Sequence, residues 1–173
     1  GGGAANSIPD SVKAVLKPLG KADTKPFLNF VKNYHEKINP DHKINISLSN
    51  NEIIIEAFGK AAHSSTPQYG LDAISVMAAY LNLASSLLAD EGAKNLAAFI
   101  AQIFPYNDFY GKNLGLFEKN QKVNGNFVGN TISSPTIIST EKGVVKVNIN
   151  LRTSFNLLFD ENGSRKNLKG STV

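Results

Sequence analysis

The chain has 173 residues, of which 42% are apolar and 18% are charged. This composition is typical of one soluble globular domain and excludes a disordered or collagen-like chain. Because the sequence contains no cysteine, thiolate catalysis, cysteine-based zinc fingers and iron–sulfur clusters are also excluded. The net charge of +4 comes from scattered lysines and only two arginines, Arg152 and Arg165. This distribution favours solubility over binding of nucleic acid.

We expect neither a signal peptide nor a membrane-spanning segment, because no N-terminal stretch has the charged-then-apolar order of a signal peptide. The most apolar run, residues 73–88, is too short to span a bilayer and is interrupted by serine and asparagine. We therefore expect a cytoplasmic chain that does not contact a membrane. The opening Gly1-Gly2-Gly3 is either an expression remnant or the start of a native strand, and the sequence leaves both open.

A helix and a hairpin are indicated in the first third of the chain. Apolar residues at three- and four-residue steps predict a helix over residues 27–38. Either Thr24 or Asp23 is its expected N-cap. Alternating apolar and polar residues over 44–49 and 52–58 then predict a β-hairpin.

Two helices are expected in the middle of the chain. An apolar stripe predicts a long helix over residues 71–88, with Asp72 in its first turn, where a carboxylate favours the helix dipole. Gly92 is expected to interrupt the helical pattern, which resumes over residues 96–103. Residues 105–111 indicate an aromatic-rich loop.

A second hairpin completes the pattern. Residues 132–138 and 145–151 read as strands joined by the turn at 141–143. With a strand before the first helix, the order is strand, helix, hairpin, helical pair and hairpin. This order predicts an α+β two-layer sandwich of ferredoxin-like type, βαββαβ, with helices on one face of an antiparallel sheet. We expect this domain to occupy residues 1–160 with an insertion at about 89–131, and residues 161–173 to form a loose tail.

The three histidines differ in their surroundings. His35 and His42 lack the spacing of a zinc-binding helix, and we expect both at the surface. His63 follows a strand on a small, polar loop that leads into a helix. Such a loop is suited to displaying a functional group, and the alternative that local features leave open is a loop-capping residue that bonds to the backbone.

Two further residues are candidates for binding. Arg152 ends a strand, and its planar fork could hold a carboxylate with two hydrogen bonds, or could simply be solvated there. Asn6 precedes a proline by three residues and on local grounds is a turn residue. The sequence contains no nucleophile elbow and no phosphate-binding glycine loop.

A longer pattern surrounds His63. Residues 59–74 resemble the signature Gly-x-x-Ala-His-x-x-x-Pro-x-x-Gly-x-(Asn/Asp)-Ala-(Ile/Ala) of the lid, or dimerisation, domain of the dinuclear-zinc aminoacylase/carboxypeptidase/dipeptidase metallopeptidases. Weaker matches bracket it at residues 3–10, which include Asn6, and at residues 147–152, which end at Arg152. The resemblance covers nearly the whole chain. The long stretch between Leu88 and Ile132, which includes Leu114-Gly115-Leu116, most resembles the PepV-like dipeptidase branch.

The resemblance implies a division of labour. A catalytic domain of the same polypeptide, absent from this chain, would bind two zinc ions, and this chain would bind none. His63 would stabilise the oxyanion of the tetrahedral intermediate, Arg152 would bind the carboxylate of a short peptide substrate, and Asn6 would assist. The isolated chain would be inert. Because lids of this branch do not need a partner subunit, we expect a monomer.

Two other functions remain as alternatives. A ferredoxin-like RNA-binding module shares the element order, but strands 44–48 and 145–151 lack the paired aromatic residues that stack on bases. A pure dimerisation module, which pairs sheets edge to edge, is the second alternative.

Overall fold

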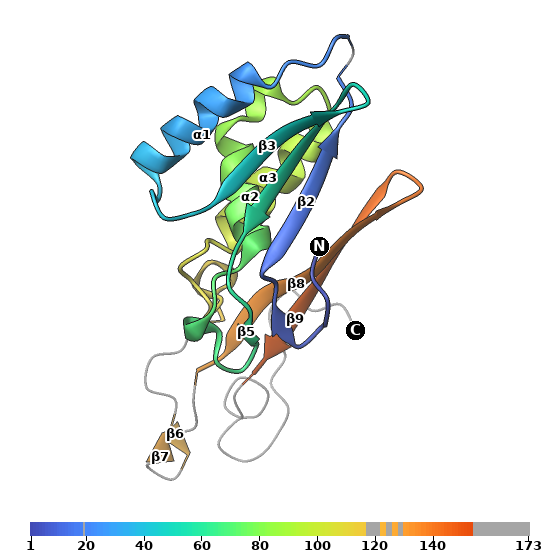
Figure 1. Cartoon of the computed structure of the whole chain (residues 1–173). Coiled ribbons are helices and arrows are strands. Elements are labelled where there is room, and N and C mark those ends of the chain that lie inside the picture. Colours follow the sequence, from blue (N-terminus) through green and yellow to red (C-terminus); the bar gives the residue numbers. More distant parts are fainter. Residues whose placement is uncertain (19, 117–121, 124–125, 128–129, 154–173) are drawn as a thin grey trace.

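The computed structural model describes residues 1–18, 20–116, 122–123, 126–127 and 130–153 (Figure 1). This part of the chain contains three α-helices and several short antiparallel sheets. The elements in chain order are β1 (Ser7–Ile8), β2 (Ser11–Leu16), α1 (Lys25–Lys37), β3 (Ile44–Ser49), β4 (Glu52–Phe58), β5 (Ala62–His63), α2 (Ala73–Leu83), α3 (Glu91–Ile103), β6 (Lys122–Val123), β7 (Asn126–Phe127), β8 (Ile132–Glu141) and β9 (Val144–Arg152).

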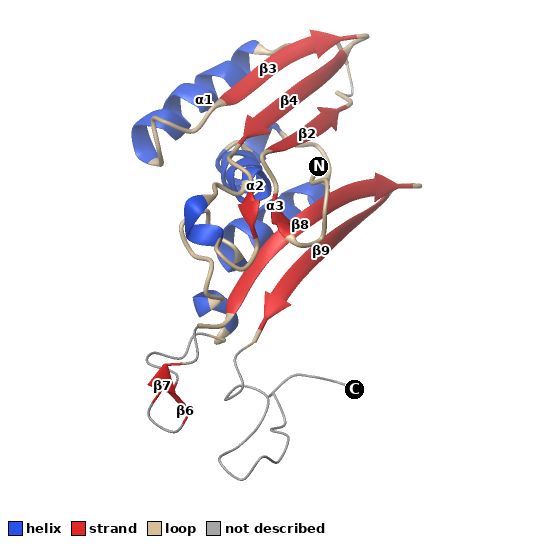
Figure 2. Cartoon of the chain, turned by 60° about the horizontal axis from the view of Figure 1, so that its bottom comes forward, coloured by secondary structure: helices blue, strands red, loops and turns tan. Residues whose placement is uncertain are grey.

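The central sheet has the order β2-β4-β3, and its three strands are antiparallel. In β4, Ile53, Ile55 and Ala57 are buried, while the residues between them are half-buried. The helices lie on one side of this sheet, as Figure 2 shows. The core therefore forms between the sheet and α2, which is buried along most of its length. The predicted α+β sandwich is confirmed.

The middle helices differ from the expectation in where they break. α2 ends at Leu83, a 3₁₀ turn follows over Ser85–Leu87, and α3 starts at Glu91. Gly92 thus lies in the first turn of α3 and interrupts nothing. The N–H of Leu87 bonds back to the carbonyl of Ala84, which closes the turn.

The second hairpin, β8–β9, forms a two-stranded sheet apart from the central one. A ferredoxin-like sheet would add a fourth strand beside β2, and the described residues show no ladder between β2 and this hairpin. Gly1 lies between the two sheets: its amino group donates to the carbonyl of Ile138 at 2.7 Å, and its carbonyl accepts from the Ile138 N–H. A Cβ on Gly1 would come within 2.6 Å of Val12. The N-terminal segment therefore lies between β2 and β8.

Some of the expected domain boundaries lie outside the described residues. The boundary near residue 160 and the tail at 161–173 fall beyond the described residues, as does part of the predicted insertion. No helix in the described ranges is both long and apolar enough to cross a membrane.

Asp72 fixes the start of α2. Its Oδ1 accepts hydrogen bonds from the N–H groups of Ile74 and Ser75 at 2.8 and 3.2 Å, which makes it the N-cap. Its Oδ2 is buried without a hydrogen-bond partner in the described part of the chain. Burial raises the pKa of the Asp72 carboxyl to about 7, although the two backbone hydrogen bonds act in the opposite direction.

We expect Asp72→Asn to alter how stability depends on pH. The folded-state pKa is raised above the unfolded value, so the carboxyl becomes progressively unfavourable as pH rises from about 4 to about 7. Asparagine keeps the capping oxygen and cannot ionise, so the variant should gain stability over the wild type across this range. Denaturant unfolding at several pH values measures the difference. Asp72→Ala, the control, should lose about 1 kcal/mol at low pH because the cap is removed. A pH-independent difference for Asp72→Asn would contradict the expectation.

Candidate functional site

The loop that carries His63 is closed at its base by backbone hydrogen bonds. The N–H of Gly59 donates to the carbonyl of Asp10 at 2.7 Å, and the N–H of Ala73 donates to the carbonyl of Pro9 at 3.0 Å. Lys60 and Leu71 pair across the loop as an isolated antiparallel bridge. The two ends of the loop are thereby held at the corner between β1 and β2.

His63 lies at the end of β5, opposite Ser7 of β1. Its side chain is exposed, and Nδ1 accepts a hydrogen bond from the backbone N–H of Ser65 at 3.2 Å. The Ser65 hydroxyl lies 2.6 Å from the same nitrogen. Because an acceptor nitrogen carries no proton, the neutral ring holds its proton on Nε2. Nε2 has no partner in the described part of the chain, and so presents a donor to solvent.

Ser64 connects the three residues predicted as the site. Its side chain is fully buried, at 0% exposure. Its N–H donates to the carbonyl of Asn6 at 2.9 Å, and its hydroxyl accepts from Nε of Arg152 at 3.2 Å. The structure therefore brings Asn6, His63 and Arg152 to one place, although the sequence separates the last two by a large part of the chain.

Arg152 reaches this place from the last residue of β9. Its side chain is exposed, and its two terminal nitrogens make no hydrogen bond to any other described residue. A second contact holds the same strand in position: Nδ2 of Asn150 donates to the carbonyl of Ala5 at 3.0 Å. The guanidinium fork is thus supported at Nε and open at its end.

Asn6 contributes in a different way from the other two. Its carbonyl accepts the Ser64 N–H, while its amide side chain is exposed and makes no hydrogen bond to a described residue. The backbone of Asn6 therefore positions the loop, and its side chain is available beside the loop.

Sequence reasoning missed the two serines that follow His63. Ser64 and Ser65 lie inside the recognised signature, but only long-range contacts reveal what they hold. Nothing in the local pattern distinguishes a buried serine from an exposed one at these two positions.

The expected surface location of His42 is wrong. His42 is 4% exposed, and its Nδ1 lies 2.7 Å from the hydroxyl of Tyr34. The ring of Tyr106 packs edge-on against it, with the centroids 4.5 Å apart. Burial lowers the pKa of His42. His35 is half-buried, and its Nε2 lies 2.8 Å from the His42 carbonyl. The burial of His42 could not be predicted from the sequence, because its neighbours Asp41 and Lys43 are charged and suggest an exposed segment.

The described residues contain no group of three or more histidine, aspartate or glutamate side chains that could hold a metal ion. The donors needed for a zinc site are therefore not gathered in this part of the chain. The candidate site consists instead of hydrogen-bond donors, namely the His63 ring, the Arg152 fork and the Asn6 amide.

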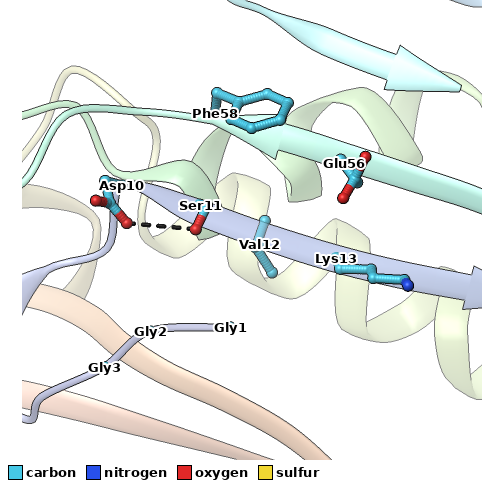
Figure 3. Close-up of a pocket in the computed structure, with 9 residues that line it drawn as sticks. All are labelled: Gly1, Gly2, Gly3, Asp10, Ser11, Val12, Lys13, Glu56 and Phe58. Atoms are coloured by element: carbon cyan, nitrogen blue, oxygen red, sulfur yellow. Dashed lines mark hydrogen bonds between the residues drawn. The ribbon is translucent and has the colours of Figure 1, made fainter.

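A separate hollow of about 410 Å³ lies beside β2 and β4 (Figure 3). Within it, the hydroxyl of Ser11 donates to Oδ1 of Asp10 at 3.3 Å. None of the predicted site residues lines it. Its walls are Gly1, Gly2, Gly3, Asp10, Ser11, Val12, Lys13, Glu56 and Phe58. The cluster around Ser64 is therefore distinct from this hollow.

Comparison with known proteins gives one informative similarity. No family model matches the chain. Over 140 residues, the chain is 29% identical to a Beta-Ala-Xaa dipeptidase from Lactobacillus delbrueckii subsp. lactis. The match covers 80% of this chain but 26% of that protein. The chain thus spans about a quarter of the length of this relative, and is similar to a segment of a dipeptidase.

Proposed function

We propose that the chain is the lid domain of a zinc-dependent exopeptidase of the dipeptidase type. The lid would close over a catalytic domain of the same polypeptide and complete the binding site for a short peptide. The carrying observation is that Ser64 joins the Asn6 segment, the His63 loop and the end of β9 through two hydrogen bonds. The partial similarity to a Beta-Ala-Xaa dipeptidase supports the same assignment.

In this proposal His63 acts on the oxyanion. Its Nε2–H is exposed, and Ser65 holds the tautomer that makes Nε2 the donor. A donor aimed at developing negative charge in a water-excluded site contributes about 3 kcal/mol to the stability of the transition state. Closing the lid over the catalytic domain would exclude the water that surrounds His63 in the open chain.

Arg152 would bind the C-terminal carboxylate of the substrate. A guanidinium can hold a carboxylate with two parallel hydrogen bonds, and the open end of Arg152 has both donors available. The Asn6 amide lies on the adjoining segment and would add a hydrogen bond to the same substrate. We propose that the lid works as a monomer and contacts neither nucleic acid nor membrane.

Zinc enters this proposal only through the catalytic domain. The described residues do not offer a set of zinc ligands, so no step here is assigned to a metal held by this chain. When bound in the catalytic domain, zinc would supply Lewis-acid activation. The isolated chain is proposed to be inert and to hold no zinc.

The test compares two substrates in the full-length protein. We expect Arg152→Ala to raise KM for a dipeptide with a free carboxylate about 10- to 100-fold, because a charge-assisted contact is lost. The KM for the C-terminally amidated dipeptide should change much less, because the amide carries no negative charge for Arg152 to bind. Steady-state kinetics on both substrates measures the contrast.

The matched control is Lys146→Ala, which removes an exposed cation from the same strand at a distance from the His63 loop. Lys146 forms an ion pair with Glu141 near the tip of the β8–β9 hairpin. Lys146→Ala should leave both KM values unchanged. An equal rise of KM for both substrates in Arg152→Ala, or no dipeptidase activity in the full-length protein, would overturn the proposed function.

A further inference from the structure

We propose that Ser64 is a positioning residue that orients Arg152 for end-on binding of a carboxylate. The Ser64 hydroxyl accepts a hydrogen bond from Nε of Arg152 at 3.2 Å. The role in substrate binding rests on the proposed function, whereas the contact itself is a property of this chain.

The geometry restricts which face of the guanidinium can bind. A guanidinium can hold a carboxylate either side-on, through Nε and one terminal nitrogen, or end-on, through both terminal nitrogens. Because the Nε–H of Arg152 already donates to Ser64, it is not available for side-on binding of a carboxylate. The two terminal nitrogens remain, and they are open in the described part of the chain. A substrate carboxylate would therefore meet the end of the fork.

Burial makes Ser64 a fixed support. The residue is fully buried, and its backbone N–H is independently held by the carbonyl of Asn6 at 2.9 Å. A long arginine side chain that is otherwise exposed loses conformational freedom when it binds a ligand. The hydrogen bond from Nε to a fixed hydroxyl removes part of that freedom beforehand, so less is lost on binding. Ser64 therefore acts on substrate affinity through Arg152 and does not touch the reacting atoms.

Removal of the hydroxyl alone tests this role. Ser64→Ala deletes the acceptor for Arg152 but keeps the backbone hydrogen bond to Asn6. The His63 ring keeps both of its contacts, because these come from Ser65. The variant should therefore affect carboxylate binding and leave the oxyanion donor in place.

The first measurement uses the 173-residue chain alone. The sequence contains two arginines, so ¹⁵N NMR should show two Nε–H signals, and Arg165→Lys assigns them. We expect Ser64→Ala to speed hydrogen exchange at Nε of Arg152 about fivefold or more, as one hydrogen bond is lost. Ser133→Ala is the matched control, because Ser133 is also buried and its hydroxyl has no partner in the described residues. Unchanged exchange in Ser64→Ala would overturn the proposal.

The second measurement uses the full-length protein. We expect Ser64→Ala to raise KM for the free-carboxylate dipeptide about fivefold, with kcat within twofold of the wild type. The amidated dipeptide should show no such rise. In an Arg152→Ala background, Ser64→Ala should add nothing further, because the two residues act through one contact. An additive effect, or a fall in kcat alone, would overturn the positioning role.

The two measurements separate two possible failures. If exchange at Arg152 responds but the full-length protein hydrolyses no dipeptide, then the proposed function fails while the Ser64–Arg152 contact stands. If Ser64→Ala does not fold, Ser64→Cys tests the contact, because a thiol of similar size is a weak hydrogen-bond acceptor. Ser64→Cys should then speed hydrogen exchange at Nε of Arg152, and an unchanged exchange rate would overturn the proposal.

Discussion

In the full-length protein, His63→Ala is expected to lower kcat by about two to three orders of magnitude with little change in KM. The physical reason is that Nε2 offers a donor that has no partner in the described structure and would bind mainly to charge formed in the transition state. Because the His63 side chain is exposed, its truncation should cost little folding stability. Single-turnover and steady-state kinetics measure the loss.

Three controls accompany His63→Ala. Zinc content by elemental analysis and thermal unfolding should both match the wild type. His63→Gln, which restores a side-chain N–H donor, should recover part of kcat. If His63→Ala instead unfolds the domain, or leaves turnover untouched, His63 is a structural loop residue and the oxyanion role is wrong.

Gly59→Ala is expected to destabilise the 173-residue chain by about 3 kcal/mol. A Cβ at Gly59 would lie 2.0 Å from the carbonyl oxygen of Leu71 and 2.9 Å from the nitrogen of Ala73. Both are backbone atoms that close the base of the His63 loop, so neither can move aside without breaking that closure. Denaturant unfolding, followed by circular dichroism, measures the change in the unfolding midpoint.

The matched control is Gly20→Ala, since a Cβ at Gly20 would have no neighbour within 4 Å. This substitution should shift stability by less than about 0.5 kcal/mol. A Gly59→Ala variant as stable as Gly20→Ala would show that the loop base can open without cost. It would also mean that the position of His63 does not depend on the closure.

Local patterns predicted most of the elements correctly. α1 and the β3–β4 hairpin have clear periods, because each buries one face against the core. The sequence did not predict the end of α2, because neither proline nor glycine marks it. The helix ends at Leu83, and the next residue, Ala84, is buried. Local periodicity does not specify a break that is set by packing.

The site was predictable to a lesser degree. His63 could be singled out from its own loop, whereas the candidacy of Arg152 and Asn6 depended mainly on the resemblance. Ser64 could not be found, because its importance comes from contacts with two distant segments. The separation of the β8–β9 hairpin from the central sheet could not be predicted either. Alternation of apolar and polar residues identifies a strand but does not specify which strand lies beside it.

The contacts that assemble the site span most of the chain. Arg152 and Ser64 are 88 residues apart, and Asn150 and Ala5 are 145 residues apart. Such closures carry a large loss of chain entropy that is recovered only when both ends have docked, so contacts of this kind tend to slow folding. In a refolding experiment, protection at the Arg152 Nε–H should therefore appear with the slowest phase, after the β3–β4 hairpin and the helices have formed. Folding intermediates of this chain would then contain its secondary structure but lack the site.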